Sequence, residues 1–306
     1  MASGRQVEQA FILGAGLGTR LRPLTDRLPK PLVPLYHRPL AAWAMDACVD
    51  AGIRRFAINT HHLPDAWRGF PAQAGHVGAD VSFFHEPVLL DTGGGLKNIE
   101  PWAGGRPLLV HNGDIFTTLP LVKLITAHQS GGCPGTLALR SQGAERRVGV
   151  DAGGTRVTDM RHLLGVDPGT HVFSGVYCIE PEFFDRLPAG GAFSVIPAMV
   201  DLAREGRLGA VVIDEGEWLD LGDRAAYLAA NLGLNLAAPI HPEAKIASGA
   251  VIERSVIGPG CEIEAGARVS DSVLWPGSRV LKDSRIENCV LFSGEPASGR
   301  HLRADL

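Results

Sequence analysis

Short apolar runs alternate with helical patterns over the first 130 residues of the chain. The first run, Val7–Leu13, predicts a buried strand, and Pro39–Asp50 has apolar residues at helical spacing before Gly52, a typical C-terminal cap. Further predicted strands are Arg54–Asn59, Asp80–Phe84 and Pro107–Val110, and further predicted helices are Gly93–Ile99 and Leu119–His128. Strands that alternate with helices predict a mainly parallel, doubly wound α/β sheet.

Beyond residue 130 the pattern changes to short strands separated by short turns. These strands are predicted at Thr136–Arg140, Arg147–Val150, Thr155–Met160 and His171–Ile179. We interpret them as an antiparallel extension that carries the pocket for a second substrate. Three elements follow, a helix at Val195–Glu205, a strand at Ala210–Ile213 and a helix at Arg224–Leu236.

From Ile240 the chain repeats itself every 17 residues, in copies at 240–256, 257–273 and 274–290. Within each copy aliphatic residues recur in steps of six, six and five, and Pro242, Pro259 and Pro276 stand in register. One inward aliphatic residue per short strand is typical of a β-helix with three strands per coil. The repeat resembles the left-handed hexapeptide-repeat β-helix. We therefore predict two domains, residues 1–236 and a short left-handed β-helix with a tail at 237–306.

A solenoid of so few coils needs cover at its ends. One end must dock on the α/β domain, on another subunit, or beneath the C-terminal tail, Gly294–Leu306. We expect the β-helix to mediate self-association into a homo-oligomer.

Composition and charge narrow the class of protein. The 306 residues are 45% hydrophobic and carry a net charge of -4, which suits a globular core and argues against nucleic-acid binding. The five cysteines are scattered and lack CxxC spacing, so we expect buried thiols in a reducing compartment. We find no run long enough to span a membrane and no signal peptide, and we expect a cytoplasmic protein without a membrane partner.

Three polar clusters follow predicted strands directly. They are Gly14–Arg20, Glu86 and Asn112–Asp114. Ligands of doubly wound sheets bind at the carboxyl ends of the strands, so the three clusters predict one crevice.

The glycine-rich stretch after the first strand suits a phosphate chain, because bare backbone N–H groups can point at phosphate oxygens. It lacks the third glycine of the dinucleotide fingerprint, which Thr19 replaces, and it lacks the GxxxxGK[ST] pattern of a P-loop. Arg20 and Lys30, the latter between Pro29 and Pro31, set it apart. Two fixed cations can balance the charge of a triphosphate. The alternative is that both are surface cations on a loop.

These residues give the chain a specific resemblance. The stretch from Gly14 to Leu32 resembles the motif of the sugar-1-phosphate nucleotidyltransferases, or NDP-sugar pyrophosphorylases. Asn112–Asp114 and Trp218–Gly222 are similar to the two metal-carboxylate motifs of that family. The resemblance covers about residues 8–235 and implies its Rossmann-like sheet, of the nucleotide-diphospho-sugar transferase type. The repeat is similar to the tails of mannose-1-phosphate guanylyltransferases and ADP-glucose pyrophosphorylases.

The resemblance implies a role for each matching residue. Arg20 and Lys30 would hold the triphosphate and stabilise the transition state, and Asp114 and Asp220 would bind one Mg²⁺. Arg20, Lys30 and Asp114 form the implied catalytic set. The implied nucleotide-binding residues are Leu13, Gly14, Ala15, Gly16, Gly18, Thr19, Glu86, Gly93 and Gly94, of which the last two would lie beside the base. The implied sugar-binding residues are Asn112, Gly149, Ser174 and Gly175.

The implied reaction between an NTP and a sugar 1-phosphate needs no general base. A sugar 1-phosphate is ionised near neutral pH, since its second pKa is about 6. Its oxygen attacks the α-phosphorus in line and pyrophosphate leaves. Catalysis then consists of alignment and charge neutralisation, for which two cations and two carboxylates with a hard metal are suited.

Several residues have a competing interpretation. Asp114 could serve a turn or a helix cap. Asp223 could compete with Asp220 as a ligand, or it could cap the helix that begins at Arg224. Many family members carry Glu-Lys-Pro, whose lysine anchors the sugar phosphate, where this chain has Thr158–Leu163. Arg161 either replaces that lysine or is a solvated surface arginine.

The missing lysine leaves the substrate open. It resembles the N-acetylmuramate-1-phosphate uridylyltransferase branch, as do Asn59–His62 and Thr92–Gly95, but that branch usually lacks a β-helix. GTP with mannose 1-phosphate and UTP with a hexose 1-phosphate therefore both remain. A non-catalytic scaffold homologue is a second hypothesis, although such proteins usually lose the charged residues retained here. A hexapeptide-repeat acyltransferase is a third, disfavoured because about three coils are too few.

Overall fold

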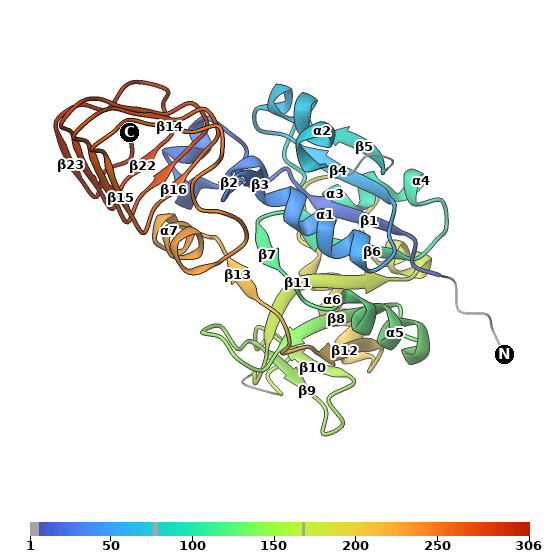
Figure 1. The fold of residues 1–306 in the computed structure, drawn as a ribbon. Coiled ribbons are helices and arrows are strands. Elements are labelled where there is room, and N and C mark those ends of the chain that lie inside the picture. The colour runs from blue at the N-terminus through green and yellow to red at the C-terminus, as the bar shows by residue number, and fades with distance from the viewer. Residues whose placement is uncertain (1–5, 76–78, 167–168) are drawn as a thin grey trace. The chain divides into compact units, whose positions relative to one another are not determined.

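The computed structural model describes residues 6–75, 79–166 and 169–306, and the chain forms two compact units (Figure 1). The first unit runs to Leu17 and continues over Ala41–Trp218. The second unit combines Gly18–Leu40 with Leu219–Leu306. A short segment near the N-terminus is thus packed with the C-terminal part of the chain, and the boundary falls inside the glycine-rich loop.

A seven-stranded sheet forms the centre of the first unit and confirms the predicted mainly parallel architecture. All its neighbouring strands are parallel except β11, which runs antiparallel to both β6 and β8. The strand order is β12 (Leu208–Val212), β8 (Gly135–Arg140), β11 (Val172–Ile179), β6 (Leu108–Asn112), β1 (Gln9–Leu13), β4 (Arg55–Thr60) and β5 (Asp80–His85). Central β1 is apolar almost throughout, as expected of a strand covered on both faces.

The structure corrects the predicted antiparallel extension. Thr136–Arg140 and His171–Ile179 belong to the main sheet as β8 and β11, and β8 pairs with β12 in parallel. Of the four strands predicted there, β9 (Val148–Val150) and β10 (Val157–Met160) form the separate antiparallel pair. The antiparallel direction is confirmed within both pairs, since β11 also runs antiparallel to β8. The separate extension was wrong for β8 and β11, because the period-two pattern of a strand does not say which other strands it pairs with.

Helices cover the sheet of the first unit. The helical elements there are α1 (Leu40–Asp50), η4 (Pro64–Gly69), α2 (Phe70–Ala74), α3 (Asp91–Asn98), α4 (Glu100–Ala103), α5 (Leu121–Gly131), η5 (Pro181–Arg186) and α6 (Ile196–Arg204). One core packs Phe11, Val110 and Tyr177 of the sheet against Leu96 of α3 and Met199 of α6. This packing holds the carboxyl ends of β1, β4 and β6 on a rigid support. Two further short strands, β7 (Ile115–Thr117) and β13 (Trp218–Asp220), lie outside this sheet.

The 17-residue repeat forms the predicted parallel β-helix within the second unit. Its register pairs Ile246 with Ile263 and Ile263 with Val280, each one repeat apart. One stack is β14 (Lys245–Ile246), β17 (Glu262–Ile263) and β20 (Arg279–Val280). The next is β15 (Val251–Glu253), β18 (Arg268–Ser270), β21 (Arg285–Glu287) and β23 (Arg300–Leu302). The third is β16 (Val256–Ile257), β19 (Val273–Leu274) and β22 (Val290–Leu291).

The two ends of the β-helix differ. The tail covers the last coil, where Ala304 and Leu306 pack against the core and the Leu306 N–H donates to the Val290 carbonyl at 2.9 Å. The first coil is open, since Ile240 and Ile246 each remain 38% exposed. Of the three coverings expected, the tail therefore supplies one.

The second unit has another core between the β-helix, α7 (Arg224–Gly233) and residues 18–40. Leu21, Leu24 and Val33 pack there with Tyr227 and Trp275. The segment at 18–40 contains η1 (Thr19–Leu21), η2 (Leu24–Asp26), η3 (Lys30–Leu32), β2 (Pro34–Leu35) and β3 (Arg38–Pro39). The motif segment with Arg20 and Lys30 thus rests on the C-terminal part of the chain.

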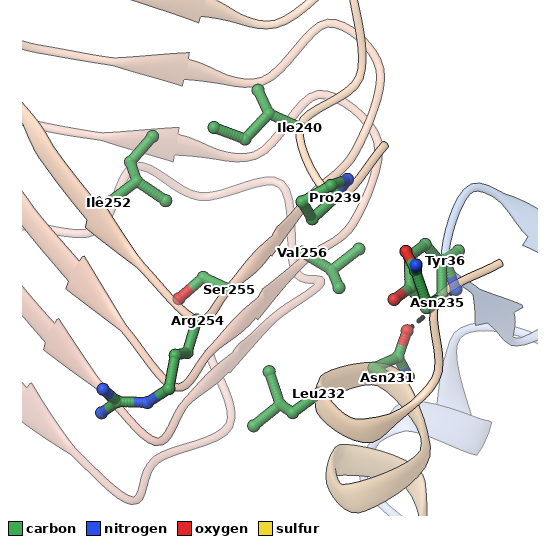
Figure 2. A pocket seen from close by; sticks show the side chains of 10 residues that line it. All are labelled: Tyr36, Asn231, Leu232, Asn235, Pro239, Ile240, Ile252, Arg254, Ser255 and Val256. Atoms are coloured by element: carbon green, nitrogen blue, oxygen red, sulfur yellow. Dashed lines mark hydrogen bonds between the residues drawn. The ribbon is translucent and has the colours of Figure 1, made fainter. Parts of the chain in front are cut away.

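A cavity of about 250 Å³ lies between the first coil and α7 (Figure 2). Ile240, Ile252 and Val256 line it from the β-helix, and Asn231 and Leu232 line it from α7. Polar side chains also line the cavity, among them those of Asn235, Arg254 and Ser255.

The five cysteines are buried and unpaired, as predicted. Within the described residues, no helix combines the length and the apolar character needed to cross a membrane.

Candidate active site

The turn that follows β1 is held by both neighbouring strands. The Gly14 N–H donates to Asn59 Oδ1 at the end of β4 at 2.7 Å, and the Leu13 carbonyl accepts from the Gly113 N–H at 3.0 Å, just after β6. A Cβ on Gly14 would lie 2.6 Å from the Asn59 carbonyl oxygen, so the close approach requires glycine. The start of the glycine loop is therefore fixed beside the residue that precedes Asp114.

The loop opens after this anchored turn. Ala15 is buried, whereas Gly16 is exposed and an added Cβ there would meet no atom within 4 Å. The backbone at Gly16 is thus accessible, as a phosphate-binding loop requires.

Glu86 is buried at the end of β5, with both carboxylate oxygens engaged. Oε1 accepts from Asn59 Nδ2 at 2.7 Å, and Oε2 accepts from the Leu90 N–H at 3.0 Å. The side chain is 1% exposed. Glu86 was predicted to bind the nucleotide, and it lies next to the glycine turn. Its carboxylate oxygens, however, accept hydrogen bonds from protein groups.

Gly93 and Gly94 lie in the first turn of α3 beneath residues 191–193. Both N–H groups donate to the Phe193 carbonyl, at 2.9 and 3.1 Å. A Cβ on Gly93 would lie 2.6 Å from the Phe193 ring, and one on Gly94 would lie 2.5 Å from the Gly191 carbonyl oxygen. This packing explains both glycines, and their position beside a base stays a prediction.

Two of the predicted sugar-binding residues are in contact. A Cβ on Gly175 would lie 2.7 Å from Asn112 Nδ2, and Gly175 has a φ of 77°. Ser174 next to it is buried, and its hydroxyl donates to the Ala138 carbonyl at 2.7 Å. Gly149 lies on the separate β9–β10 pair, opposite Asp159. Their role in sugar binding stays a prediction.

The second unit brings together both predicted cations and one predicted metal ligand. Lys30 Nζ lies 3.8 Å from Asp220 Oδ1. The Lys30 side chain is 6% exposed and that of Asp220 is 48% exposed. A Cβ on Gly222 would lie 3.0 Å from Arg20 Nη2, so the guanidinium lies against this backbone. A buried lysine packed in this way is not a solvated loop cation.

Gly18 allows Lys30 to pack closely on the loop. Gly18 has a φ of 62°, and an added Cβ would lie 2.9 Å from the Lys30 Cβ. Thr25 Oγ1 donates to the Gly18 carbonyl at 3.0 Å and fixes the turn. Thr19 follows as the first residue of η1 and is exposed.

Asp223 caps α7, which decides one of the alternatives. Its Oδ1 accepts from the Ala226 N–H at 2.9 Å, as expected of an N-cap residue. This carboxylate is occupied in the helix terminus, and Asp220 is the residue of the pair that lies beside Lys30.

The predicted metal ligands, Asp114 and Asp220, come from different units. Among the described residues, no three His, Cys, Asp or Glu side chains are grouped as a metal site. Mg²⁺ prefers oxygen donors and is often held by one or two carboxylates together with substrate phosphates and water. Two aspartates therefore fit this ion as a donor set.

His111 lies two residues before Gly113, on β6. Burial lowers its pKa to about 4, which the carbonyl of Asn112 and the charge of Asp114 partly oppose. The imidazole is therefore neutral near pH 7 and adds no positive charge beside Asp114.

Three residues of this region were not predicted to be site residues. They are Asn59, which joins Gly14 to Glu86, Thr25, which fixes Gly18, and Gly222, which lies against Arg20. Asn59 is a polar residue at the carboxyl end of a predicted strand, which is the feature that pointed to Glu86. The other two depend on contacts across many residues.

Comparison with known proteins identifies the family. The model described as "Nucleotidyl transferase" matches residues 9–235, and the one described as "GMPPB C-terminal domain" matches residues 236–295. The N-acetylmuramate alpha-1-phosphate uridylyltransferase of Neisseria meningitidis serogroup B is 30% identical over 217 residues, which cover 70% of this chain and 93% of that protein.

Guanylyltransferases are similar over more of the chain. The mannose-1-phosphate guanylyltransferase of Mycobacterium tuberculosis is 28% identical over 280 residues, covering 82% of this chain and 77% of that protein. The mannose-1-phosphate guanylyltransferase catalytic subunit beta of Xenopus tropicalis is 28% identical over 229 residues. The match covers 72% of this chain and only 62% of that relative.

Solved structures of UDP-glucose pyrophosphorylase have a similar fold over 74% of this chain. The crystal structure of a UDP-glucose pyrophosphorylase complexed with UDP-glucose has a TM-score of 0.62 at 19% identity, covering 74% of this chain and 98% of the other. The family match includes the glycine loop, Asn112–Asp114 and the end of β13, which are the parts of the site that the structure anchors. The chain therefore belongs to the nucleotidyl transferase family.

Proposed function

We propose that the chain transfers a nucleotidyl group from an NTP to a sugar 1-phosphate and releases pyrophosphate. The observation that carries this proposal is the placement of Lys30, a buried cation whose Nζ lies 3.8 Å from Asp220 Oδ1. Gly222, two residues after Asp220, lies against the Arg20 guanidinium. Family members that have lost activity usually lack these charged residues. In this chain Arg20, Lys30 and Asp220 are retained. This retention disfavours the alternative of a non-catalytic scaffold.

In the proposed reaction an oxygen of the sugar phosphate attacks the α-phosphorus of the NTP. A new P–O bond forms, the bond from the α-phosphorus to the bridging oxygen breaks, and pyrophosphate leaves with the electron pair. Arg20 and Lys30 hold the triphosphate and neutralise charge that develops on the leaving group. No residue needs to remove a proton, because the attacking phosphate is ionised near neutral pH.

We assign Asp114 and Asp220 to one Mg²⁺. The ion would neutralise phosphate charge and align the two substrates. The anchored turn at Leu13 and Gly113 supports the role of Asp114, and the proximity of Asp220 to Lys30 supports a shared polyanionic ligand.

The remaining site residues keep the roles that the motifs imply. The proposed nucleotide-binding set is Leu13, Gly14, Ala15, Gly16, Gly18, Thr19, Glu86, Gly93 and Gly94, and the proposed sugar-binding set is Asn112, Gly149, Ser174 and Gly175. The contact between Asn112 and Gly175 supports the second set. For Glu86 the buried carboxylate supports an indirect part in the nucleotide site.

Two substrate pairs fit the relatives. The similarity to mannose-1-phosphate guanylyltransferases supports GTP with mannose 1-phosphate. The similarity to a uridylyltransferase supports UTP with a hexose 1-phosphate, including N-acetylmuramate 1-phosphate. Pyrophosphate release should be measured for four NTPs against mannose, glucose and N-acetylmuramate 1-phosphates, with Asp114→Asn as the inactive control. Absence of pyrophosphate release from every pair would refute the proposed function.

We further propose that the chain forms a homo-oligomer through the open first coil. We also propose that it is located in the cytoplasm. The exposure of Ile240 and Ile246 supports this surface. Ile240 also lines the adjoining cavity (Figure 2). The domain boundary near residue 236 remains part of the same proposal, and the change of family match between residues 235 and 236 supports it.

A further inference from the structure

We infer that Asn59 and Glu86 act together as positioning residues, forming a buried hydrogen-bonded relay that fixes the Gly14 turn to the loop at Leu90. The inference deepens the proposed function, on which its kinetic test rests. It changes the role of Glu86 from a group that contacts the nucleotide to one that orders the backbone around it.

The relay consists of three consecutive hydrogen bonds. The Gly14 N–H donates to Asn59 Oδ1 at 2.7 Å, Asn59 Nδ2 donates to Glu86 Oε1 at 2.7 Å, and the Leu90 N–H donates to Glu86 Oε2 at 3.0 Å. Asn59 is 2% exposed and Glu86 is 1% exposed. Hydrogen bonds to an ionised acceptor in a site shielded from water are short and strong.

The surroundings leave no room for another partner between the two side chains. An added Cβ on Gly95 would lie 2.8 Å from both Asn59 Nδ2 and Glu86 Oε1, so the backbone of α3 lies directly on their hydrogen bond. The Glu86 carbonyl is also engaged, since His61 Nδ1 lies 2.7 Å from it. Glu86 is therefore held from several sides and cannot reach a base edge while the relay is intact.

The relay joins three parts of the proposed nucleotide site. Gly14 begins the phosphate loop, Leu90 precedes the α3 glycines, and Gly95 lies on the relay itself. A displacement of about 1 Å in such a site is enough to lower the rate strongly. We infer that the relay holds the phosphate loop at Gly14 and the segment from Leu90 to the α3 glycines at a fixed separation. Recognition of the base is then left to the backbone of these two segments.

Polarity explains why an amide and a carboxylate are needed. Asn59 must accept from Gly14 and donate to Glu86, and Glu86 must accept twice. An aspartate at position 59 would lack the donor and would place two carboxylates together. A glutamine at position 86 would turn one acceptor into a donor. Making both changes restores the pattern, because the introduced amide can donate to the introduced carboxylate while its carbonyl oxygen accepts from Leu90.

The test is the cycle of N59D, E86Q and the double variant N59D/E86Q. We expect each single variant to lower kcat/KM for the NTP by about tenfold or more, because each leaves a buried polar group unsatisfied. The double variant should recover most of this loss. Amide hydrogen exchange at Gly14 and Leu90, followed by NMR, should accelerate in the single variants and slow again in the double variant.

Gln9 provides a matched control on β1, the strand that Gly14 follows. It is a buried amide at the opposite end of β1, where Nε2 donates to the Ala103 carbonyl at 2.9 Å and Oε1 accepts from Arg55. Q9E should lower stability without changing the KM for the NTP or the exchange of Gly14. If N59D does not fold, N59A, which removes both the donor to Glu86 and the acceptor for Gly14, takes its place in the hydrogen-exchange test.

Two results would overturn the relay. One is a double variant whose losses multiply instead of recovering, and the other is unchanged exchange at Gly14 and Leu90 in the single variants. A kinetic loss in Q9E equal to that in N59D would likewise assign the effect to general destabilisation. If the wild-type chain releases no pyrophosphate with any NTP, the proposed function fails, whereas hydrogen exchange still decides on the relay.

Discussion

The indole Nε1 of Trp275 donates a hydrogen bond of 2.9 Å to the phenolic oxygen of Tyr227. Trp275 belongs to the β-helix and Tyr227 to α7, and the same phenol donates to the Pro34 carbonyl at 2.7 Å. Burial raises the pKa of Tyr227 well above its usual range, so the phenol remains a donor. Pro34 lies four residues after Lys30, and the β-helix therefore supports the segment that carries this proposed catalytic cation.

Removal of this hydroxyl should weaken the second unit. We expect Tyr227→Phe to lower the free energy of unfolding by about 1–3 kcal/mol, because it leaves the Trp275 N–H and the Pro34 carbonyl without their buried partner. Urea unfolding measures the loss. Tyr177→Phe is the matched control, since the buried Tyr177 hydroxyl has no hydrogen-bond partner among the described residues. Equal losses in both variants would contradict the role of the bridge.

The Lys30 side chain should matter for rate more than for folding. Lys30→Met keeps the aliphatic stem that packs against Gly18 but removes the charge beside Asp220. We expect kcat to fall by about 10²–10³-fold, the usual effect of removing one electrostatic group from a transition state. Steady-state pyrophosphate release measures it, with exposed Lys282→Met as control. Activity near wild type would show that Lys30 does not contact the triphosphate.

The two proposed metal ligands should act as a pair. Asp114→Asn and Asp220→Asn should each weaken Mn²⁺ binding in the presence of an NTP, measured by electron paramagnetic resonance, and chelation of divalent ions should abolish turnover. Asp223→Asn is the matched control, since asparagine also caps helices and the α7 terminus remains satisfied. Mn²⁺ affinity that falls equally in all three variants would not support the assignment.

Buried histidines should make the protein sensitive to mild acid. Burial lowers the pKa of His128 to about 4, from 6.5 for an exposed histidine, although Glu180 Oε1 lies 3.4 Å from its Nε2. Between these pH values the unfolded chain binds more protons, so stability falls as the pH is lowered from 6.5 toward 4. The loss for one such group is about 2 kcal/mol at pH 5.

His128→Gln should reduce this pH dependence, because glutamine does not titrate and can still contact Thr136, whose Oγ1 lies 2.9 Å from His128 Nδ1. Thermal unfolding between pH 7.5 and 4.5 compares the two proteins. His162→Gln, at an exposed position, should leave the profile unchanged. A wild-type slope retained in His128→Gln would assign the acid sensitivity to other groups.

The open coil predicts where self-association can be broken. Ile246→Lys places a charge on the exposed apolar end, and we expect the oligomer to dissociate, as measured by light scattering over a range of concentrations. Leu302→Lys is the control on the opposite side, where the residue is 52% exposed but belongs to the capped end. A wild-type protein that is monomeric at all concentrations would rule out this surface.

Elements with strong local patterns were predicted well. The 17-residue repeat fixed the stacks of the β-helix because each inward aliphatic residue recurs at the period of the coil, and the register of Ile246 with Ile263 follows directly. The ends of α3 and α5 shifted by a few residues, because caps depend on local contacts that periodicity does not contain. The membership of β8 and β11 in the main sheet was not predicted, because it depends on tertiary pairing.

The candidate site was predicted only in part. Residue types and spacing pointed to Arg20, Lys30 and Asp220, since fixed charges near glycines are locally visible in a sequence. The engaged carboxylate of Glu86 was not predictable in this way, because its donors come from Asn59, 27 residues earlier, and from the backbone of Leu90. The same holds for Gly222, whose reason for being glycine is the guanidinium of a residue near the N-terminus.

The second unit is built from two stretches of chain separated by residues 41–218. During synthesis, the segment that bears Arg20 and Lys30 is made long before Tyr227 and Trp275, on which it packs. Contacts of such large sequence separation form late in folding. A nascent chain should therefore acquire its central sheet first and order the proposed catalytic cations later, so that competence for nucleotidyl transfer appears only after Tyr227 and Trp275 have been made.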